Sequence, residues 1–188
     1  MDQRTLVEQA RRGDHDAFAT LARGAAVRLD RAARLMVRDP ELARDAVQDA
    51  LIRAWRDLPG LREPDRFDAW LHRLLAHACL DLIRRRRRRP IEVELTNLDT
   101  TVAGDPAHEL ADRELLGEAL ARLEPEWRAI VVLHYLLGMP LPEVAASLGI
   151  PLGTAKSRLH RAVGVMRATV TGDPGPGPVP PSLEGVVA

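Results

Sequence analysis

One apolar stripe along residues 67–90, FDAWLHRLLAHACLDLIRRRRRRP, constrains the fold more than any other feature of the sequence. The apolar residues of this stripe recur at helical spacings and are Phe67, Trp70, Leu71, Leu74, Leu75, Ala78 and Leu82. The periodicity predicts a long amphipathic helix, whose apolar face must be covered by neighbouring helices. Six consecutive arginines, Arg84 to Arg89, follow the stripe and stop at Pro90.

The segment before this stripe also predicts helices. Leucines recur among charged residues over residues 6–37, and a further helix is expected to start at Pro40. Asp39 is the expected N-cap of that helix, and Glu41 suits the helix dipole. We expect its apolar side to consist of Leu42, Ala46, Leu51 or Ala50, Ala54 and Leu58. Aromatic residues make up only 3% of the chain, so aliphatic residues must fill the cores, and this composition favours helices.

Composition divides the chain into two small helical domains, which makes the predicted fold class all-α. Residues 91–108 are acidic, rich in threonine and without helical period, so we interpret them as a flexible linker. The domains are then residues 1–90 and residues 109–171. Residues 172–188 contain so much proline and glycine that they cannot build a core, and we expect them to be disordered.

Charge and cysteine content narrow the class of protein. Residues 1–90 hold 20 arginines against 14 acidic residues, whereas residues 91–112 hold six acidic residues and no basic one. No apolar run approaches the length of a transmembrane helix, and the N-terminus lacks the apolar stretch of a signal peptide. Cys79 is the only cysteine, so no internal disulfide is possible. These features favour a cytoplasmic protein without membrane insertion.

Residues 141–170 show the pattern of a helix-turn-helix. A short helix, 141–148, is expected to end at Gly149, and Pro151 suits the first turn of a second helix. The inward side of the second helix is expected to be Ala155, Leu159, Ala162, Val163 and Met166. The outward side is then basic, and a basic helix can enter the major groove and pair with guanine edges. The alternative is an ordinary helical hairpin with a solvated face.

Four segments in a fixed order carry a resemblance to a known family. They are GDHDAFATL, DAVQDALIRAW, RFDAWLHRLLAHACLDLIRRRRRRP and ALARLEPEWRAIVVLHYLLGMPLPEVAASLGIPLGTAKSRLHRA. With them, the chain resembles the extracytoplasmic-function branch of the bacterial sigma-70 family over most of residues 13–170. The last segment is the most specific, because GIPLGTAKSRLHRA is similar to the promoter-reading helix of that family. The first domain then corresponds to region 2 and the second to region 4.

The resemblance implies a transcription initiation factor rather than an enzyme. Such a protein binds core RNA polymerase and directs it to promoters through their minus-10 and minus-35 elements, without a cofactor or metal. It is expected to be a monomer when free. Many family members are held inactive by an anti-sigma partner that covers both DNA-reading domains, and the sequence leaves such a partner open.

The resemblance also assigns residues to polymerase binding. In the family, the helix that matches DAVQDALIRAW docks on the clamp helices of the largest catalytic subunit of RNA polymerase. The residues assigned to this contact are Asp45, Gln48, Asp49, Arg53 and Trp55. The alternative is that Asp49 and Arg53 form an i,i+4 ion pair and that Trp55 packs in the core.

A second set of residues corresponds to the element that captures a flipped minus-10 base. These residues are Asp65, Arg66, Arg73 and His77. Asp65 has a second possible role, as the N-cap of the helix that begins near Phe67. The chain departs from the family at His77, where Asn is usual, and this leaves the preferred minus-10 base open.

The region-4 helix corresponds to the reader of the minus-35 element. Its expected contacts are Thr154, Lys156, Ser157, Arg158, His160 and Arg161. The run from Arg84 to Arg89 is expected to attract phosphates in a salt-sensitive way and to suit the C-terminal end of the helix dipole. A nuclear-import signal has the same composition, but it has no role in a bacterial family.

Two other functions and a metal site remain as alternatives at this stage. One alternative is a free-standing helix-turn-helix regulator that acts without polymerase, in which DAVQDALIRAW belongs only to the core. The other is a pure interaction protein, such as a sigma-like decoy. His72, His77 and Cys79 suggest zinc only weakly, because the histidines are five residues apart and no fourth ligand is near. We expect no metal, and we expect Cys79 to be a core residue.

Overall fold

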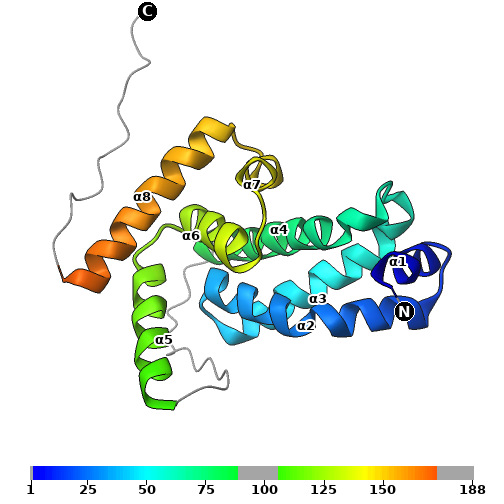
Figure 1. Ribbon diagram of the computed structural model, residues 1–188, viewed down its shortest axis with the longest axis horizontal. Helices are drawn as coiled ribbons and strands as arrows, with labels where there is room; N and C mark the ends of the chain where they lie inside the picture. Colours follow the sequence, from blue (N-terminus) through cyan, green and yellow to red (C-terminus); the bar gives the residue numbers. More distant parts are fainter. Residues whose placement is uncertain (1, 89–105, 173–188) are drawn as a thin grey trace, which may run out of the picture.

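Helices make up all the regular secondary structure in the described part of the chain, as the sequence predicts. The structure is a computed structural model that describes residues 2–88 and 106–172. Most of the predicted linker, the tail after Gly172 and Arg89 lie outside the described residues. The first unit contains α1 (Gln3–Arg11), α2 (His15–Val37), α3 (Pro40–Asp57) and α4 (Phe67–Arg88), with the short turns η1 (Leu58–Gly60) and η2 (Pro64–Arg66) between α3 and α4. The second unit contains α5 (Pro106–Ala121), α6 (Pro125–Val131), η3 (Val132–Leu136), α7 (Leu141–Leu148) and α8 (Leu152–Thr171) (Figure 1).

The core of the first unit lies between α2, α3 and α4, each of which contacts the other two. Its largest fully buried side chains include Leu29, Met36, Phe67, Leu71 and Leu75. Three of these belong to the stripe that the sequence shows along α4. Burying a side chain of this size contributes about 1.5–3 kcal/mol, so the stripe fixes α4 against its neighbours.

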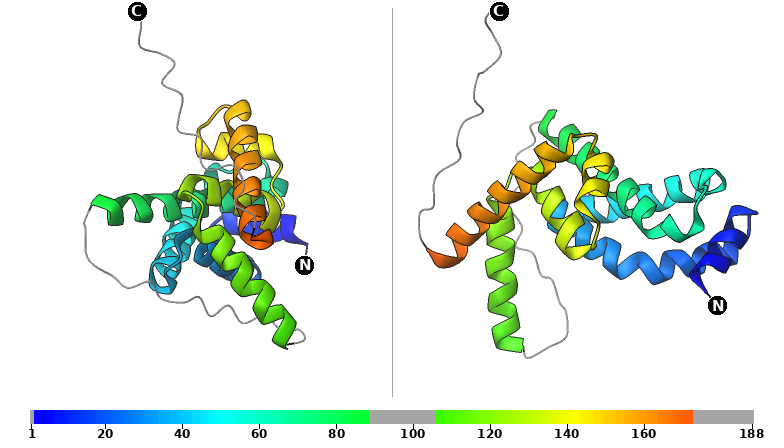
Figure 2. Two further views of the ribbon diagram at one scale, coloured as in Figure 1. Left: turned by 90° about the vertical axis from the view of Figure 1, so that its left-hand side faces the viewer. Right: turned by 45° about the horizontal axis from the view of Figure 1, so that its top comes forward.

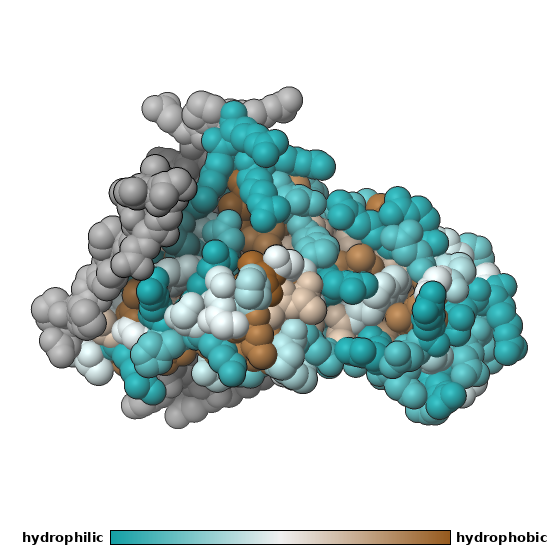
Figure 3. All heavy atoms as spheres, turned by 90° about the horizontal axis from the view of Figure 1, so that it is seen from above, coloured by the Kyte–Doolittle hydropathy of each residue, from teal (hydrophilic) through white to brown (hydrophobic). Residues whose placement is uncertain are grey.

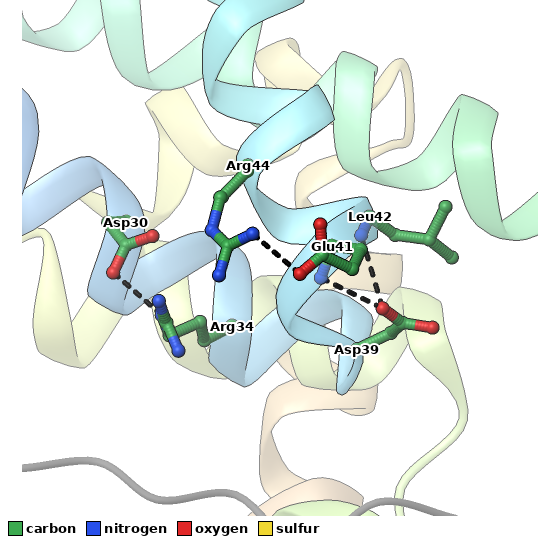
Figure 4. Close-up of polar contacts among 6 residues, drawn as sticks. All are labelled: Asp30, Arg34, Asp39, Glu41, Leu42 and Arg44. Atoms are coloured by element: carbon green, nitrogen blue, oxygen red, sulfur yellow. Dashed lines mark hydrogen bonds and ion pairs between the residues drawn. The ribbon is translucent and has the colours of Figure 1, made fainter. Parts of the chain in front are cut away.

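The start of α3 is capped as the sequence predicts. Asp39 Oδ1 accepts hydrogen bonds from the backbone N–H groups of Glu41 at 3.0 Å and Leu42 at 3.1 Å, and Pro40 opens the helix (Figure 4). These bonds satisfy two backbone donors that have no partner inside the helix. Replacing such a cap by alanine costs about 1 kcal/mol.

The buried face of α3 is largely the predicted one, because Ala46, Ala54 and, of the two residues left open, Ala50 belong to it. It consists of alanines, since Ala43, Ala46, Ala50 and Ala54 are fully buried, while Leu51 is only half-buried. Leu42 lies on the same apolar side, as predicted, and is half-buried against the core. Small side chains let α3 approach α2 and α4 closely, while Leu42, Val47 and Leu51 pack at the edge of the core and Ile52 is exposed.

The second unit contains the predicted helix-turn-helix. Gly149 ends α7 with a φ of 66°, a left-handed conformation that glycine adopts without the clash of a Cβ atom. Pro151 directly precedes α8, on whose inner side Ala155 and Ala162 are fully buried. One π-helical turn, η3, continues α6, and the Leu137 N–H donates to the Val132 carbonyl at 3.1 Å.

The two units pack against each other. Helix α7 contacts α4, and both α6 and η3 contact α2. Buried residues of the second unit, among them Ile130, Leu133 and Val144, belong to the same apolar cluster as the core of the first unit. Helix α5 and the C-terminal part of α8 project away from α1–α4 (Figures 1 and 2). The described residues therefore form the two helical units that the sequence predicts, and one apolar cluster joins them.

Candidate protein and nucleic-acid interfaces

An apolar groove of about 480 Å³ lies between α2 and α3. We call it the α3 groove, and it is lined by Asp30, Arg44, Val47, Gln48, Leu51, Ile52 and Trp55. Ile52 is 57% exposed, although its helix already buries an alanine face on the opposite side. An exposed cluster of large apolar side chains beside charged ones is typical of a protein-docking surface.

Trp55 packs against α2 and also lines the α3 groove. Its ring lies 4.4 Å from the His15 ring and 5.1 Å from the Phe18 ring, measured between centroids, and both partners come from α2. The residue is half-buried. The two alternatives that the sequence leaves open for Trp55 are therefore compatible, because one face of the indole is held while the side chain still reaches the groove.

The polar residues predicted at this surface fall into two groups. Asp45 and Gln48 are exposed on α3. Asp49 and Arg53 instead pair with each other, since Arg53 Nη2 lies 2.7 Å from Asp49 Oδ2, and Arg53 Nη1 also lies 4.0 Å from Asp81 Oδ2. The ion pair expected at i,i+4 is thus present within α3, and the approach to Asp81 links Arg53 to α4.

A second surface is formed by η2 and the outer side of α4. We call it the α4 surface and define it by Asp65, Arg66, Arg73 and His77. The side chains of Arg66 and Arg73 are exposed, as predicted. Asp65 lies inside η2, and its Oδ2 is 3.4 Å from Nη1 of Arg4, so the N-cap role suggested for it is wrong. The preceding 3₁₀ turn leads directly into α4 and leaves no cap position for Asp65.

Helix α7 contacts the α4 surface at two of its residues. Arg66 Nη2 donates to Glu143 Oε1 at 2.9 Å, and the His77 Nε2–H donates to the Ser147 carbonyl. A groove of about 370 Å³ lies along this contact between the two units. The residues that line it are Leu61, Arg62, Glu63, Arg66, Ala69, Trp70, Arg73, Met139, Glu143, Ala146 and Ser147. Two of the four residues predicted to bind the minus-10 strand thus contact α7 of the second unit.

The outer side of α8 is the third surface. Lys156, Ser157, His160 and Arg161 are exposed, and Thr154 and Arg158 are half-buried. Ser157 Oγ donates to the Thr154 carbonyl at 3.0 Å, which holds this hydroxyl on its own helix. Seen from the side of α7 and α8, the molecular surface is mostly hydrophilic, with apolar patches between the polar side chains (Figure 3). The six residues predicted to read minus-35 DNA thus share one helix.

The arginine run is partly neutralised in this structure. Arg84, Arg86 and Arg87 lie 3.6, 2.8 and 3.3 Å from carboxylate oxygens of Asp81, Asp39 and Glu124. All five arginines from Arg84 to Arg88 are exposed at the end of α4. Exposed ion pairs contribute only about 0–1 kcal/mol, so a DNA phosphate can replace these carboxylates at little cost.

Two titratable side chains are buried in the first unit. Burial, together with the nearby charge of Arg28, lowers the pKa of His72 to about 4. Burial also raises the pKa of the Cys79 thiol to about 12, and the expectation that Cys79 is a core residue is confirmed.

In residues 2–88 and 106–172 no group of three or more His, Cys, Asp or Glu side chains is placed to hold a metal ion. No helix in the same ranges has both the length and the apolarity needed to span a membrane.

Two features of these surfaces were not predicted from the sequence. The first feature is the lining of the α3 groove by Val47, Leu51 and Ile52. The sequence pattern that could have indicated it is a second apolar face on a helix that already has an alanine face. The contacts of Glu143 and Ser147 with the α4 surface join residues 77 and 70 positions apart, so no local pattern could have indicated them.

Comparison with known proteins identifies the family of the two units. Residues 21–89 match the family described as sigma-70 region 2, and residues 113–164 match sigma-70 region 4. The RNA polymerase sigma-E factor of Streptomyces avermitilis is 36% identical over 137 residues, which are 73% of this chain and 75% of that protein. The ECF RNA polymerase sigma factor SigM of Mycobacterium tuberculosis is 37% identical over 157 residues, 80% of this chain and 75% of that protein.

Two further matches extend the comparison. The ECF RNA polymerase sigma factor SigE of Mycolicibacterium smegmatis is 40% identical over 63% of this chain, a match that spans about half of that protein, 48%. Among solved structures, CnrH in complex with the cytosolic domain of CnrY is 31% identical, covers 91% of this chain and 98% of its own, and gives a TM-score of 0.66. The chain therefore belongs to the extracytoplasmic-function branch of the sigma-70 family, and it is an alternative sigma factor that directs RNA polymerase to promoters.

Proposed function

We propose that the three surfaces divide promoter recognition between them. The α3 groove docks on core RNA polymerase, the α4 surface binds the minus-10 strand, and the outer side of α8 reads the minus-35 duplex. The observation that carries this proposal is the chemical separation of the surfaces. Large apolar side chains gather on α3, whereas exposed basic side chains gather on α4 and α8.

The α3 groove suits a helical partner such as the polymerase clamp helices. Trp55, held by His15 and Phe18, is a pre-positioned aromatic anchor, and such residues dominate the energy of many protein interfaces. The exposed Asp45 and Gln48 provide polar contacts beside it. In this proposal Asp49 acts with Arg53, because the ion pair between them fixes both side chains in position to meet the polymerase.

The α4 surface suits a single DNA strand with one base flipped out. Arg66 and Arg73 attract the phosphates, and His77 offers a ring that can stack on a base and donate a hydrogen bond. Family members usually have Asn at this position, and an imidazole lacks the paired donor and acceptor of a carboxamide. We therefore expect the base preference at this position to differ from that of an Asn-bearing relative.

On α8, the residues that we expect to contact bases are Arg158 and Arg161. Lys156, Ser157 and His160 lie beside them, and Thr154 lies in the first turn, where backbone N–H groups favour a phosphate. Each bidentate contact between arginine and guanine contributes about 1–3 kcal/mol of discrimination. The exposed run at the end of α4 adds attraction to phosphates without sequence preference.

Reconstituted transcription tests this division of roles. The protein is added to core polymerase on a promoter that the holoenzyme itself selects from genomic fragments. Arg158→Ala combined with Arg161→Ala should weaken promoter binding by about 1–3 kcal/mol per lost base contact, with polymerase binding unchanged. Arg167→Ala is the matched control, because Arg167 is exposed on the same helix outside the predicted contacts. Specific DNA binding without any transcript would instead indicate a free-standing regulator.

The chain is also a candidate for control by an anti-sigma protein. CnrH, which resembles this chain over both units, is bound in its solved structure to the cytosolic domain of CnrY. We propose that this chain, a monomer when free, has a partner of comparable role. Co-purification of a single tightly bound protein that blocks polymerase binding in the reconstituted system would support that role.

A further inference from the structure

None of the three surfaces includes a residue of α1, and α1 also lies before the segment that matches sigma-70 region 2, which begins at residue 21. The helix folds back on α2 through a tight turn in which Gly13 has a φ of 95° and its N–H donates to the Ala10 carbonyl at 3.0 Å. Directly after this turn, Asp14 caps α2 by accepting hydrogen bonds from two backbone N–H groups of that helix. Val7 and Ala10 are buried in the core of the first unit. Both the turn and the core therefore fix the position of α1.

The loop between α3 and α4 has little buried surface of its own. Over residues 59–66, all of which the structure describes, no side chain is fully buried, and Leu61 and Pro64 are half-buried. Helices α1 and α4 both contact η2, and α1 also contacts η1, so that α1 lies along this loop at one end of the first unit (Figure 1). Because a segment with few buried contacts is easily displaced, the position of this loop depends on the helices beside it.

Arg4 links α1 to Asp65, the residue of this loop that belongs to the α4 surface. Nη1 of Arg4 lies 3.4 Å from Oδ2 of Asp65, and Nε of Arg4 donates to Glu8 Oε1 at 3.2 Å. Glu8 is one helical turn farther along α1, so it orients the guanidinium group that meets Asp65. The side chain of Asp65 is still 69% exposed beside Arg4. Its carboxylate can therefore accept a hydrogen bond from a base while Arg4 holds it.

From these contacts we infer that α1 supports the loop that captures the flipped minus-10 base, and that Arg4 is a positioning residue for Asp65. Asp65 meets the base, and Arg4 acts only through Asp65, by holding its carboxylate in one place. Placement matters because a hydrogen bond weakens steeply when its angle is poor, so selectivity for one base depends on the orientation of the carboxylate. The inference rests on the proposed role of the α4 surface. It predicts that a change on α1 alters base preference without a contact between α1 and DNA.

The test compares two charge reversals of equal size. Arg4→Glu places a carboxylate beside Asp65 and repels it. Arg12→Glu makes the same change in net charge at the other end of α1, about 12 Å away at 1.5 Å per residue, where Arg12 is exposed. Any general loss of attraction to DNA is therefore common to both variants. Arg4→Lys keeps the positive charge beside Asp65 and is the conservative variant.

Hydrogen exchange in the full-length free chain reports the support of the loop. The N–H groups of Leu61 and Arg66 donate to carbonyls inside the loop, each at 3.0 Å. These two amides should exchange roughly threefold faster in Arg4→Glu than in Arg12→Glu or Arg4→Lys, an effect within the range of one exposed ion pair. Amides in the buried middle of α4 should exchange equally in all variants, because an exposed ion pair adds little to global stability.

Base preference is measured with the holoenzyme. Each position of the minus-10 element is randomised in a promoter that the wild-type holoenzyme selects, and the bases among the bound fragments are counted. Arg4→Glu should reduce the preference at one minus-10 position by roughly threefold, whereas Arg4→Lys and Arg12→Glu should keep it. Preferences in the minus-35 element should be equal in all variants, because the residues predicted to read that element lie on α8.

The outcomes separate the inference from the proposed function on which it rests. If Asp65→Ala changes the minus-10 preference and Arg4→Glu does not, the positioning role of Arg4 is overturned while the role of the α4 surface stands. Weaker binding of all bases alike in Arg4→Glu would also overturn it, because α1 would then support only the fold. If neither Asp65→Ala nor Arg66→Ala combined with Arg73→Ala alters minus-10 preference or transcription, the proposed function of the α4 surface itself fails.

Discussion

His72 gives the free energy of unfolding a pH dependence whose size can be worked out in advance. The residue is 4% exposed in the core around α4, and its pKa falls from 6.5 to about 4, chiefly because burial disfavours the charged ring. The folded state therefore binds fewer protons than the unfolded state between these two values. Stability from the neutral ring is fully present above pH 6.5 and is lost as the pH falls toward 4.

The expected magnitude follows from the two pKa values. The full loss is about 3 kcal/mol, at 1.36 kcal/mol per pKa unit. Between pH 7.5 and pH 5.5, where only part of the loss has occurred, His72 should account for about 1.4 kcal/mol. His72→Leu removes the titrating ring and its buried Nε2, which has no hydrogen-bond partner among the described residues, while keeping an apolar side chain in the core.

Urea unfolding followed by tryptophan fluorescence provides the measurement. Other groups also titrate over this range, so the quantity of interest is the difference between variants in the loss of stability from pH 7.5 to 5.5. The loss should be smaller by about 1.4 kcal/mol in His72→Leu, and it should be unchanged in His160→Leu, whose histidine is exposed on α8. Identical pH dependence in wild type and His72→Leu would refute the assignment of a buried neutral ring.

Two other predictions concern the docking and phosphate-binding surfaces. Ile52→Lys should weaken binding to core polymerase at least tenfold in a competition assay while leaving thermal stability nearly unchanged, because Ile52 is exposed in the α3 groove; Val170→Lys, on an exposed apolar residue of α8, is its control. Equal loss in both variants would mean that the groove is not the docking surface. Replacing Arg84, Arg85 and Arg88 together by alanine should reduce the salt dependence of promoter binding by about one phosphate contact per arginine, without changing promoter preference. Altered preference would show that the run reads bases.

Local features of the fold were predictable because their physical causes are local. The cap at Asp39 and the stop at Gly149 depend on neighbouring backbone groups, and the stripe from Phe67 to Leu82 depends only on helical spacing. The two exposed arginines of the α4 surface followed from the same spacing, because they lie off that stripe. Each of these expectations depends only on residues within a few helical turns of one another in the sequence.

Features that depend on how helices approach one another were not predictable. On α3, both the alanines and the larger residues such as Leu51 recur at helical spacings, and only the distance to α2 and α4 decides which set is buried. The pairing of Arg66 with Glu143 depends on the arrangement of two units whose connecting residues give no pattern. The role suggested for Asp65 as a cap was wrong for a similar reason, since the 3₁₀ turn at η2 is set by its surroundings.

The alanine face of α3 has a consequence for how this helix tolerates mutation. Ala43, Ala46, Ala50 and Ala54 are fully buried, and enlarging a side chain in such a tightly packed place costs about 1–3 kcal/mol. Changes to Val47, Leu51 and Ile52 fall on the open side instead. A saturation library of α3 should therefore separate into two phenotypes at helical intervals, one that loses soluble protein and one that yields stable protein with altered partner choice. That separation would let the binding properties of α3 be changed in this chain without loss of its fold.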